Sequence, residues 1–329
     1  MSLPDQSRIA PDALAASNRF DVILVKIELA AKDINLYTFR REDDAVLPPA
    51  EPGAHIGLFL ANGMERQYSL VIADPNPRAY TIGVKRDAAS RGGSRFVHDE
   101  LRVGTRLSIA PPRNNFILDE SAAVTLLFAG GIGITPIYCM FRRLRTLGRE
   151  AALHYANRSR GETAFLRDLR DEPGVSFHFD EEENGRFLPI GVLVRDAPAD
   201  AHLYCCGPMP MLAAFEKATE GRKAAQVHIE YFTPKFEAAV AGGFIVELAR
   251  TKQEFFIAEG RSILDVLREA GVDVSYSCEQ GICGSCETRV LSGEPDHRDS
   301  ILSEGERAAG QSMMICCSGA KSERLVLDL

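Results

Sequence analysis

Five of the eight cysteines in this 329-residue chain fall in its last quarter, in a spacing that could hold a metal cluster. Cys278, Cys283 and Cys286 stand in the order Cys-x4-Cys-x2-Cys within the segment CEQGICGSC. With a fourth cysteine downstream, this spacing is typical of plant-type 2Fe-2S clusters, in which four thiolates hold two irons. Cys316 and Cys317 both remain candidates for the fourth ligand, because neighbours in an extended segment point in opposite directions.

A four-cysteine zinc site is the alternative interpretation of these residues. Zinc sites of that kind usually combine two short Cys-x-x-Cys pairs, and this part of the chain contains only one such pair. Gly281 and Gly284 would let the loop fold tightly enough for backbone N–H groups to approach the sulfurs. The pattern therefore favours a 2Fe-2S cluster that accepts one electron at a time.

A second group of chemically useful residues is the glycine-rich segment FAGGIGITP. Gly130, Gly131 and Gly133 follow an apolar run and precede a helix that we expect to open at Pro136. Free N–H groups at such a helix start can hold phosphate. Glycines of this kind also occur in tight turns that bind nothing, so the segment alone is a moderate indication of a nucleotide site.

Two shorter segments carry further candidate binding residues. Cys206-Gly207-Pro208 follows another apolar run and either flanks a nicotinamide or is only a strand-to-helix turn. Arg66-Gln67-Tyr68-Ser69 offers a cation for phosphate, an aromatic face for a flavin ring and a hydroxyl, although such a run is more often an ordinary half-buried strand. Arg91-Gly92-Gly93-Ser94 could present N–H groups to phosphate.

The elements that would position these residues change in type along the chain. Short apolar runs separated by Gly and Pro turns predict an antiparallel β-barrel with an N-terminal arm in residues 1–118. Apolar runs that alternate with helical stretches predict a doubly wound α/β domain in residues 119–232. A linker at 233–243 then leads to a small α+β domain at 244–329. We therefore expect a multidomain protein.

Composition and charge exclude several classes of protein. A net charge of -8 disfavours a general nucleic-acid binder, which needs a basic face. The N-terminus lacks the basic and apolar pattern of a secretory signal, and the uncharged stretch 121–141 is interrupted by glycines. We expect no membrane span and a cytoplasmic location, where cysteine clusters serve metal binding rather than structural disulfides.

Taken together, the motifs resemble those of the phthalate dioxygenase reductase family, which includes vanillate demethylase reductases. The resemblance covers nearly the whole chain through the segments RQYSL, VKRD with RGGS, AGGIGITPI, YCCGP, CEQGICGSC, DHRD and MMICCSGAKSERLVLDL. It implies a flavin β-barrel, a nucleotide-binding domain and a C-terminal plant-type ferredoxin of the β-grasp fold. It also implies FMN rather than FAD as the flavin.

The resemblance further assigns expected roles to individual residues. Arg66 and the stretch from Arg91 to Ser94 would hold the FMN phosphate, Tyr68 and Ser69 the ring, and Val84 and Lys85 would add contacts. Thr135 would lie near flavin and nicotinamide, with Cys206, Gly207 and Pro208 along the nucleotide site and Phe232 packed near the flavin. Ser69, Thr135 and Cys206 would then border the site of hydride transfer. The fourth cluster ligand would be Cys316.

The implied function is electron transfer from NADH to FMN, then to the 2Fe-2S cluster, and then to a Rieske-type non-haem iron oxygenase. A cytochrome P450 partner is one alternative, and a non-enzymatic cluster-based redox sensor is another. Nucleotide preference is less clear from the residues, because the run from Asn157 to Arg160 has no acid to meet a ribose hydroxyl. Its two arginines, Arg158 and Arg160, could accept a 2′-phosphate, whereas the resemblance favours NADH.

Overall fold

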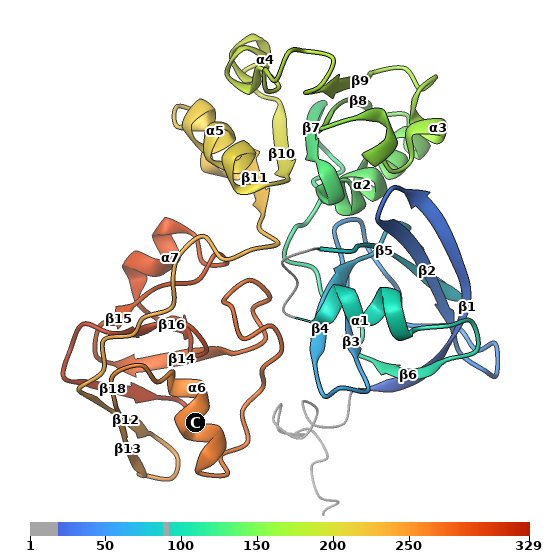
Figure 1. Cartoon of the computed structure of the whole chain (residues 1–329). Coiled ribbons are helices and arrows are strands. Elements are labelled where there is room, and N and C mark those ends of the chain that lie inside the picture. The colour runs from blue at the N-terminus through green and yellow to red at the C-terminus, as the bar shows by residue number, and fades with distance from the viewer. Residues whose placement is uncertain (1–18, 88–91) are drawn as a thin grey trace, which may run out of the picture. The chain divides into compact units, whose positions relative to one another are not determined.

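The computed structural model describes residues 19–87 and 92–329 (Figure 1). These residues form two compact units. The larger unit holds residues 22–87, 92–107 and 112–237, and the smaller holds 238–329 together with the short stretches 19–21 and 108–111.

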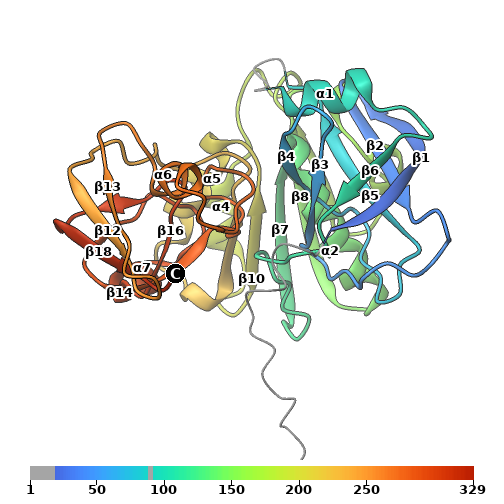
Figure 2. The ribbon, with the colours of Figure 1, turned by 90° about the horizontal axis from the view of Figure 1, so that it is seen from below.

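A six-stranded antiparallel barrel occupies the first part of the chain, as predicted, and its strands are seen together in Figure 2. The strand order is β4-β3-β6-β1-β2-β5, and a bridge from Leu70 to Ile82 joins the end of β4 to β5. The helix α1 (Gly93–Glu100) follows β5. The strands are β1 (Phe20–Ala31), β2 (Ile34–Arg40), β3 (His55–Phe59), β4 (Glu65–Ser69), β5 (Ala79–Lys85) and β6 (Arg106–Ile109).

A five-stranded parallel sheet follows the barrel, in the order β11-β10-β7-β8-β9. The chain adds β8 and β9 on one side of β7 and β10 and β11 on the other, so the order reverses between β7 and β10. Ligands of such sheets bind at this reversal, beyond the carboxyl ends of the strands. The strands are β7 (Val124–Gly130), β8 (Glu150–Asn157), β9 (Val175–Phe179), β10 (His202–Cys206) and β11 (Val227–Glu230).

Helices cover both faces of this sheet, and alternate residues of its strands therefore pack into two different cores. Leu127 of β7 packs with residues of α2 (Ile134–Thr146), whereas Phe128 packs with α4 (Ile190–Asp196) and α5 (Met209–Thr219). The first of these cores also contains the barrel residues Ile34 and Val71. The barrel and the sheet therefore share buried apolar contacts within one unit.

The smaller unit is an α+β fold around a mixed sheet of order β13-β12-β18-β14-β16, as predicted. Its first two strands form a hairpin, and β12 pairs in parallel with the last strand of the chain. Ser262 caps α6 through a bond from the Asp265 N–H. The elements are β12 (Phe244–Leu248), β13 (Glu254–Ile257), α6 (Ile263–Glu269), β14 (Glu287–Ser292), β15 (Pro295–Asp296), α7 (Glu304–Ala309), β16 (Ser312–Met314), β17 (Gly319–Ala320) and β18 (Arg324–Leu327).

Two expectations about helices need comment. The helix α2 begins at Ile134, two residues before the expected start at Pro136. Proline is tolerated there because the first turn of a helix has no intrahelical partner for its N–H groups. Within the ranges 19–87 and 92–329, no helix has the length and hydropathy needed to cross a membrane.

Candidate functional site

The loop between α6 and β14 carries three of the expected cluster cysteines, and Cys316, just after β16, joins them. Cys278, Cys283, Cys286 and Cys316 are all buried. The thiol of Cys278 contacts those of Cys283 and Cys316, and Cys316 also contacts Cys286. A hydrogen bond from Cys283 lowers the pKa of Cys278, and one from Cys316 lowers the pKa of Cys286. The four thiols thus share one small volume, as ligands of a compact cluster must.

Backbone conformation in this loop directs polar groups toward the sulfurs. Gln280 N–H donates to Cys278 Sγ at 3.3 Å, and Cys283 Sγ lies 3.3 Å from Ser285 Oγ. Gly281 and Gly284 adopt φ values of +67° and +73°, which side chains disfavour. Among the described residues, no three His, Cys, Asp or Glu side chains surround a single ion position. A 2Fe-2S cluster uses two thiolates on each iron and does not need such an arrangement.

The adjacent cysteines after β16 have different surroundings. Cys316 contacts the thiols of Cys278 and Cys286, whereas Cys317 contacts only Cys316 among the four proposed ligands and its Sγ lies beside Gly281. A Cβ atom at position 281 would be 2.4 Å from that sulfur, so the loop can pass Cys317 only as glycine. Cys317 therefore fills space behind the loop.

Asp299, in the DHRD segment, supports the cluster loop from behind and was given no role by the sequence reasoning. It is fully buried and accepts the N–H groups of Ile301 and Leu302 at 2.9 and 2.7 Å. The next residue, Ser300, donates its N–H to the Gly281 carbonyl at 2.8 Å. The sequence offered one indication of this role, which is the presence of Asp299 in the DHRD segment. A carboxylate that becomes buried needs hydrogen-bond partners, so it commonly has a structural role.

Arg66 on β4 meets the start of α1 in the barrel. A Cβ atom at Gly93 would be 2.7 Å from Arg66 Nε, so glycine is needed for this approach. Gly92, at the N-terminus of the helix, has a φ of +101°. Ser94 Oγ accepts the Asp87 N–H at 3.2 Å. A guanidinium beside the N-terminus of a helix suits a phosphate group.

The rest of the β4 segment is half-buried up to Ser69, which is buried. Tyr68 is half-buried, and burial raises the pKa of its phenol. Gln67 Nε2 donates to Glu65 at 3.1 Å. Ser69 is only 4% exposed, and its Oγ has no hydrogen-bond partner among the described residues. A buried hydroxyl without a hydrogen-bond partner costs free energy, and a polar atom of the flavin ring would supply the missing partner.

The remaining predicted flavin contacts lie on or near β5. Val84 is buried and its carbonyl lies 2.9 Å from His98 Nε2, whereas Lys85 is exposed. Arg91 lies outside the described residues, so its place is not shown.

The glycine loop and the Cys206-Gly207-Pro208 turn touch each other at the carboxyl ends of β7 and β10. A Cβ atom at Gly133 would be 2.2 Å from the Cys206 carbonyl oxygen, and one at Gly130 would be 2.5 Å from Pro208 Cδ. Gly131 adopts a φ of +54°. Gly130 and Gly133 are thus required by the close approach of the two loops, whether or not a nucleotide is bound. The structure also brings both predicted nucleotide segments to one rim.

Thr135 joins this rim to the barrel. A Cβ atom at Gly83 of β5 would be 2.7 Å from Thr135 Cγ2. The threonine hydroxyl donates to the Ile132 carbonyl at 3.1 Å and is therefore used within the loop. Thr135 and Cys206 are 1% and 0% exposed, so both are buried at this rim.

Glu230, at the end of β11, is a functional candidate that the sequence reasoning missed. It pairs in register with Cys206, and its carboxylate atom Oε2 is buried without a hydrogen-bond partner among the described residues. Burial raises the pKa of this carboxyl to about 8. Burial, and then Glu230, raise the pKa of the Cys206 thiol. The sequence signal that could have identified Glu230 is an acidic residue at the carboxyl end of a strand of the parallel sheet.

Two further predicted residues lie near this rim. Phe232 packs on the core cluster that contains Ile34, Ala129 and Cys206. Arg158 is exposed, directly after β8.

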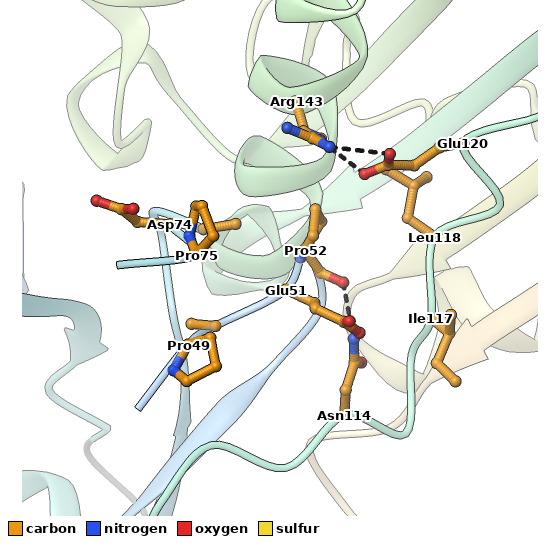
Figure 3. A pocket seen from close by; sticks show the side chains of 12 residues that line it. Pro49, Glu51, Pro52, Asp74, Pro75, Asn114, Ile117, Leu118, Glu120 and Arg143 are labelled. Carbon is orange, nitrogen blue, oxygen red and sulfur yellow. Dashed lines mark hydrogen bonds and ion pairs between the residues drawn. The ribbon is translucent and has the colours of Figure 1, made fainter. Parts of the chain in front are cut away.

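A hollow on the larger unit, shown in Figure 3, contains none of these residues. Its cation Arg143 is held by Glu120 through two bonds of 2.6 and 3.0 Å. Asn114 in its wall donates to the Pro52 carbonyl at 3.0 Å. The Arg143 guanidinium and the Asn114 amide, which could bind an anion, are thus already hydrogen-bonded within the protein. We assign the hollow no role.

Comparison with known proteins relates these features to those of iron-sulfur reductases. A family profile described as 2Fe-2S iron-sulfur cluster binding domain matches residues 246–321. The chain is 48% identical over 316 residues to a tetrachlorobenzoquinone reductase from Sphingobium chlorophenolicum, covering 94% of this chain and 98% of that protein. It matches a solved phthalate dioxygenase reductase at 37% identity and a TM-score of 0.72, covering 95% and 99% of the two chains. The chain belongs to the phthalate dioxygenase reductase family.

Another solved structure, an intact type IV self-sufficient cytochrome P450 monooxygenase, matches this reductase at 37% identity and a TM-score of 0.85. The match covers 94% of this chain and 41% of that protein. Family membership confirms the predicted oxidoreductase, its role as the reductase of an oxygenase system, and FMN, NAD(H) and a 2Fe-2S cluster as its cofactors.

Proposed function

We propose that this reductase passes electrons from NADH to FMN at the rim of the larger unit, and from there to a 2Fe-2S cluster held by Cys278, Cys283, Cys286 and Cys316. The observation that carries the proposal is the gathering of four buried thiols in a chain whose other unit sets a nucleotide loop against a barrel strand. In this assignment residues 1–118 bind FMN, 119–232 bind NADH, 233–243 form a linker and 244–329 bind the cluster.

The residues present fit these groups. The four buried thiols supply the donors that two irons require, and the unpartnered Ser69 hydroxyl with Arg66 and the start of α1 fits a flavin phosphate and ring. When bound, FMN accepts a hydride as two electrons and releases them singly to the cluster, so the cofactors supply the redox chemistry. The protein must orient them and exclude water.

Individual side chains then have binding and positioning roles. Arg66, with Arg91, Gly92, Gly93 and Ser94, holds the FMN phosphate, while Tyr68 and Ser69 contact the ring. Gly83 and Thr135 set the distance between the barrel and the nucleotide rim, since any larger residue at 83 would push the threonine away. Gly130, Gly131 and Gly133 let the nucleotide pass close to the backbone. Cys206, Gly207 and Pro208 form the opposite wall.

The proposed electron acceptor is a Rieske-type non-haem iron oxygenase. Support comes from the solved relative, which is a phthalate dioxygenase reductase. Two other acceptors have support of their own: a cytochrome P450, from the self-sufficient relative, and a quinone, from the tetrachlorobenzoquinone reductase. The buried free thiols suit a reducing compartment, and we place the protein in the cytoplasm.

Acceptor competition tests this proposal. The loaded protein is mixed with NADH and, separately, with a purified Rieske oxygenase and its substrate, a cytochrome P450 and its substrate, and tetrachlorobenzoquinone. We expect coupled turnover with the Rieske oxygenase, and its loss in the Cys283→Ser variant, in which NADH still reduces the flavin. Turnover with the P450 alone, or quinone reduction that survives Cys283→Ser with no oxygenase turnover, would replace the Rieske assignment.

A further inference from the structure

Two arginines follow β8 at the rim of the parallel sheet, where the adenosine ribose of a bound nucleotide lies in folds of this kind. The run from Asn157 to Arg160 contains no acid of its own. The structure brings an acid to Arg160 from the turn that follows β9. Because β8 and β9 pair in parallel and the Glu181 N–H donates to the Arg158 carbonyl at 3.1 Å, the acidic run 180–183 lies alongside these arginines.

Arg160 is held by one member of this acidic run. Its Nε and Nη2 donate to the two carboxylate oxygens of Glu182 at 2.6 and 2.9 Å, and its guanidinium stacks 4.5 Å from the centre of the Phe179 ring. The hydrogen bond from Arg160 lowers the pKa of Glu182, so the acid is ionised at neutral pH. The planar fork of the arginine is thereby filled by a carboxylate of the same chain.

We infer that Glu182 sets the preference of this reductase for NADH over NADPH, an inference that rests on the proposed nucleotide site. The 2′-phosphate of NADPH carries close to two negative charges and would compete with Glu182 for the guanidinium fork of Arg160. The phosphate would also approach the Glu182 carboxylate, which repels it. NADH lacks that phosphate and meets neither obstacle.

The chain offers a matched control one residue away. Glu183 forms a similar surface pair with Arg186, at 3.1 Å, and the side chains of Glu183 and Glu182 are 46% and 49% exposed. Glu183→Gln therefore removes the same charge from the same segment without releasing Arg160. A general electrostatic effect would appear equally in both variants.

Equilibrium binding of 2′,5′-ADP and 5′-AMP measures the inference without any redox step. We expect Glu182→Gln to tighten 2′,5′-ADP binding by about fivefold, the scale of one exposed charge contact, and to leave 5′-AMP binding nearly unchanged. Glu183→Gln should leave both unchanged. Adding Arg160→Gln to Glu182→Gln should abolish the gain. The same pattern should appear in kcat/KM for NADPH against NADH, with ferricyanide as acceptor.

The outcomes separate this inference from the proposed function. If wild type binds 5′-AMP and is reduced by NADH, but Glu182→Gln does not improve 2′,5′-ADP binding, only the inference fails. An equal gain in Glu183→Gln, or a gain that survives Arg160→Gln, also overturns it. A correctly folded, loaded protein that binds neither nucleotide overturns both.

Discussion

At the residue scale, the candidate site contains buried polar groups that the described residues do not satisfy. Ser69 Oγ and Glu230 Oε2 are both buried without partners among the described residues. Such groups carry an energetic cost, and they persist where a ligand supplies the missing partner. Spacing alone identified Cys278, Cys283 and Cys286 as cluster ligands, whereas the choice of Cys316 over Cys317 rested on the family resemblance. Spacing did not identify Glu230 or Asp299, because their importance depends on burial by residues distant in sequence.

The Glu230 carboxyl predicts a pH dependence of stability. Its pKa is about 8 in the folded protein and 4.5 in the reference state, so between these pH values the folded state holds a proton that the unfolded state has lost. Stability should therefore fall with rising pH across this window, by up to about 1.4 kcal/mol per pH unit.

Glu230→Gln removes this dependence. Urea unfolding of the variant should match wild type near the lower end of the window and show greater stability near its upper end. Glu220→Gln, at an exposed position of the same unit, should follow wild type throughout. Equal pH profiles for wild type and Glu230→Gln would show that the carboxyl is ionised in the folded protein.

Substitution of the adjacent cysteines distinguishes ligand from packing residue. Cys316→Ser removes a thiol that contacts Cys278 and Cys286, and we expect loss of the cluster from the purified protein. Cys317→Ser changes a side chain that packs behind Gly281 and contacts only Cys316 among the four proposed ligands, and serine keeps a group of similar size there, so the cluster should remain. Iron content and visible absorption measure both. Retention in Cys316→Ser with loss in Cys317→Ser would reverse the assignment.

At the element scale, the site is built where strands end and glycines let neighbouring loops touch. The strand and helix order of the parallel sheet and the hairpin of the smaller unit were predictable, because apolar periodicity and turn residues are local signals. The contact of Gly133 with the Cys206 carbonyl was not predictable, because it joins two loops more than seventy residues apart. The acidic run 180–183 was likewise not predictable as a neighbour of Arg160, because it follows a different strand, β9.

Gly133→Ala tests this contact between loops. The new methyl would lie 2.2 Å from the Cys206 carbonyl oxygen, so one loop must move, at a cost of about 1–3 kcal/mol in the free energy of unfolding. Weaker NADH binding should accompany it. Gly191→Ala in α4, where a Cβ atom meets nothing within 4 Å, is the control and should be neutral or slightly stabilising. Unchanged stability and NADH affinity in Gly133→Ala would contradict the contact.

At the scale of the whole molecule, the proposed function places a two-electron entry site and a one-electron exit site in separate compact units of one chain. The larger unit holds the barrel and the nucleotide sheet with shared apolar contacts, and the smaller unit holds the cluster cysteines. The order of these parts along the chain was predictable from their motifs. Electron flow between the units is the central claim, since each unit alone would bind a cofactor without connecting donor to acceptor.

The most direct test is electron paramagnetic resonance of the protein frozen after anaerobic mixing with NADH. We predict that the signal of a reduced 2Fe-2S cluster appears, that it disappears from samples depleted of FMN, and that it returns when FMN is restored. Dithionite should reduce the cluster in every sample. A cluster that dithionite reduces but NADH leaves oxidised in the FMN-loaded protein would contradict the proposed path.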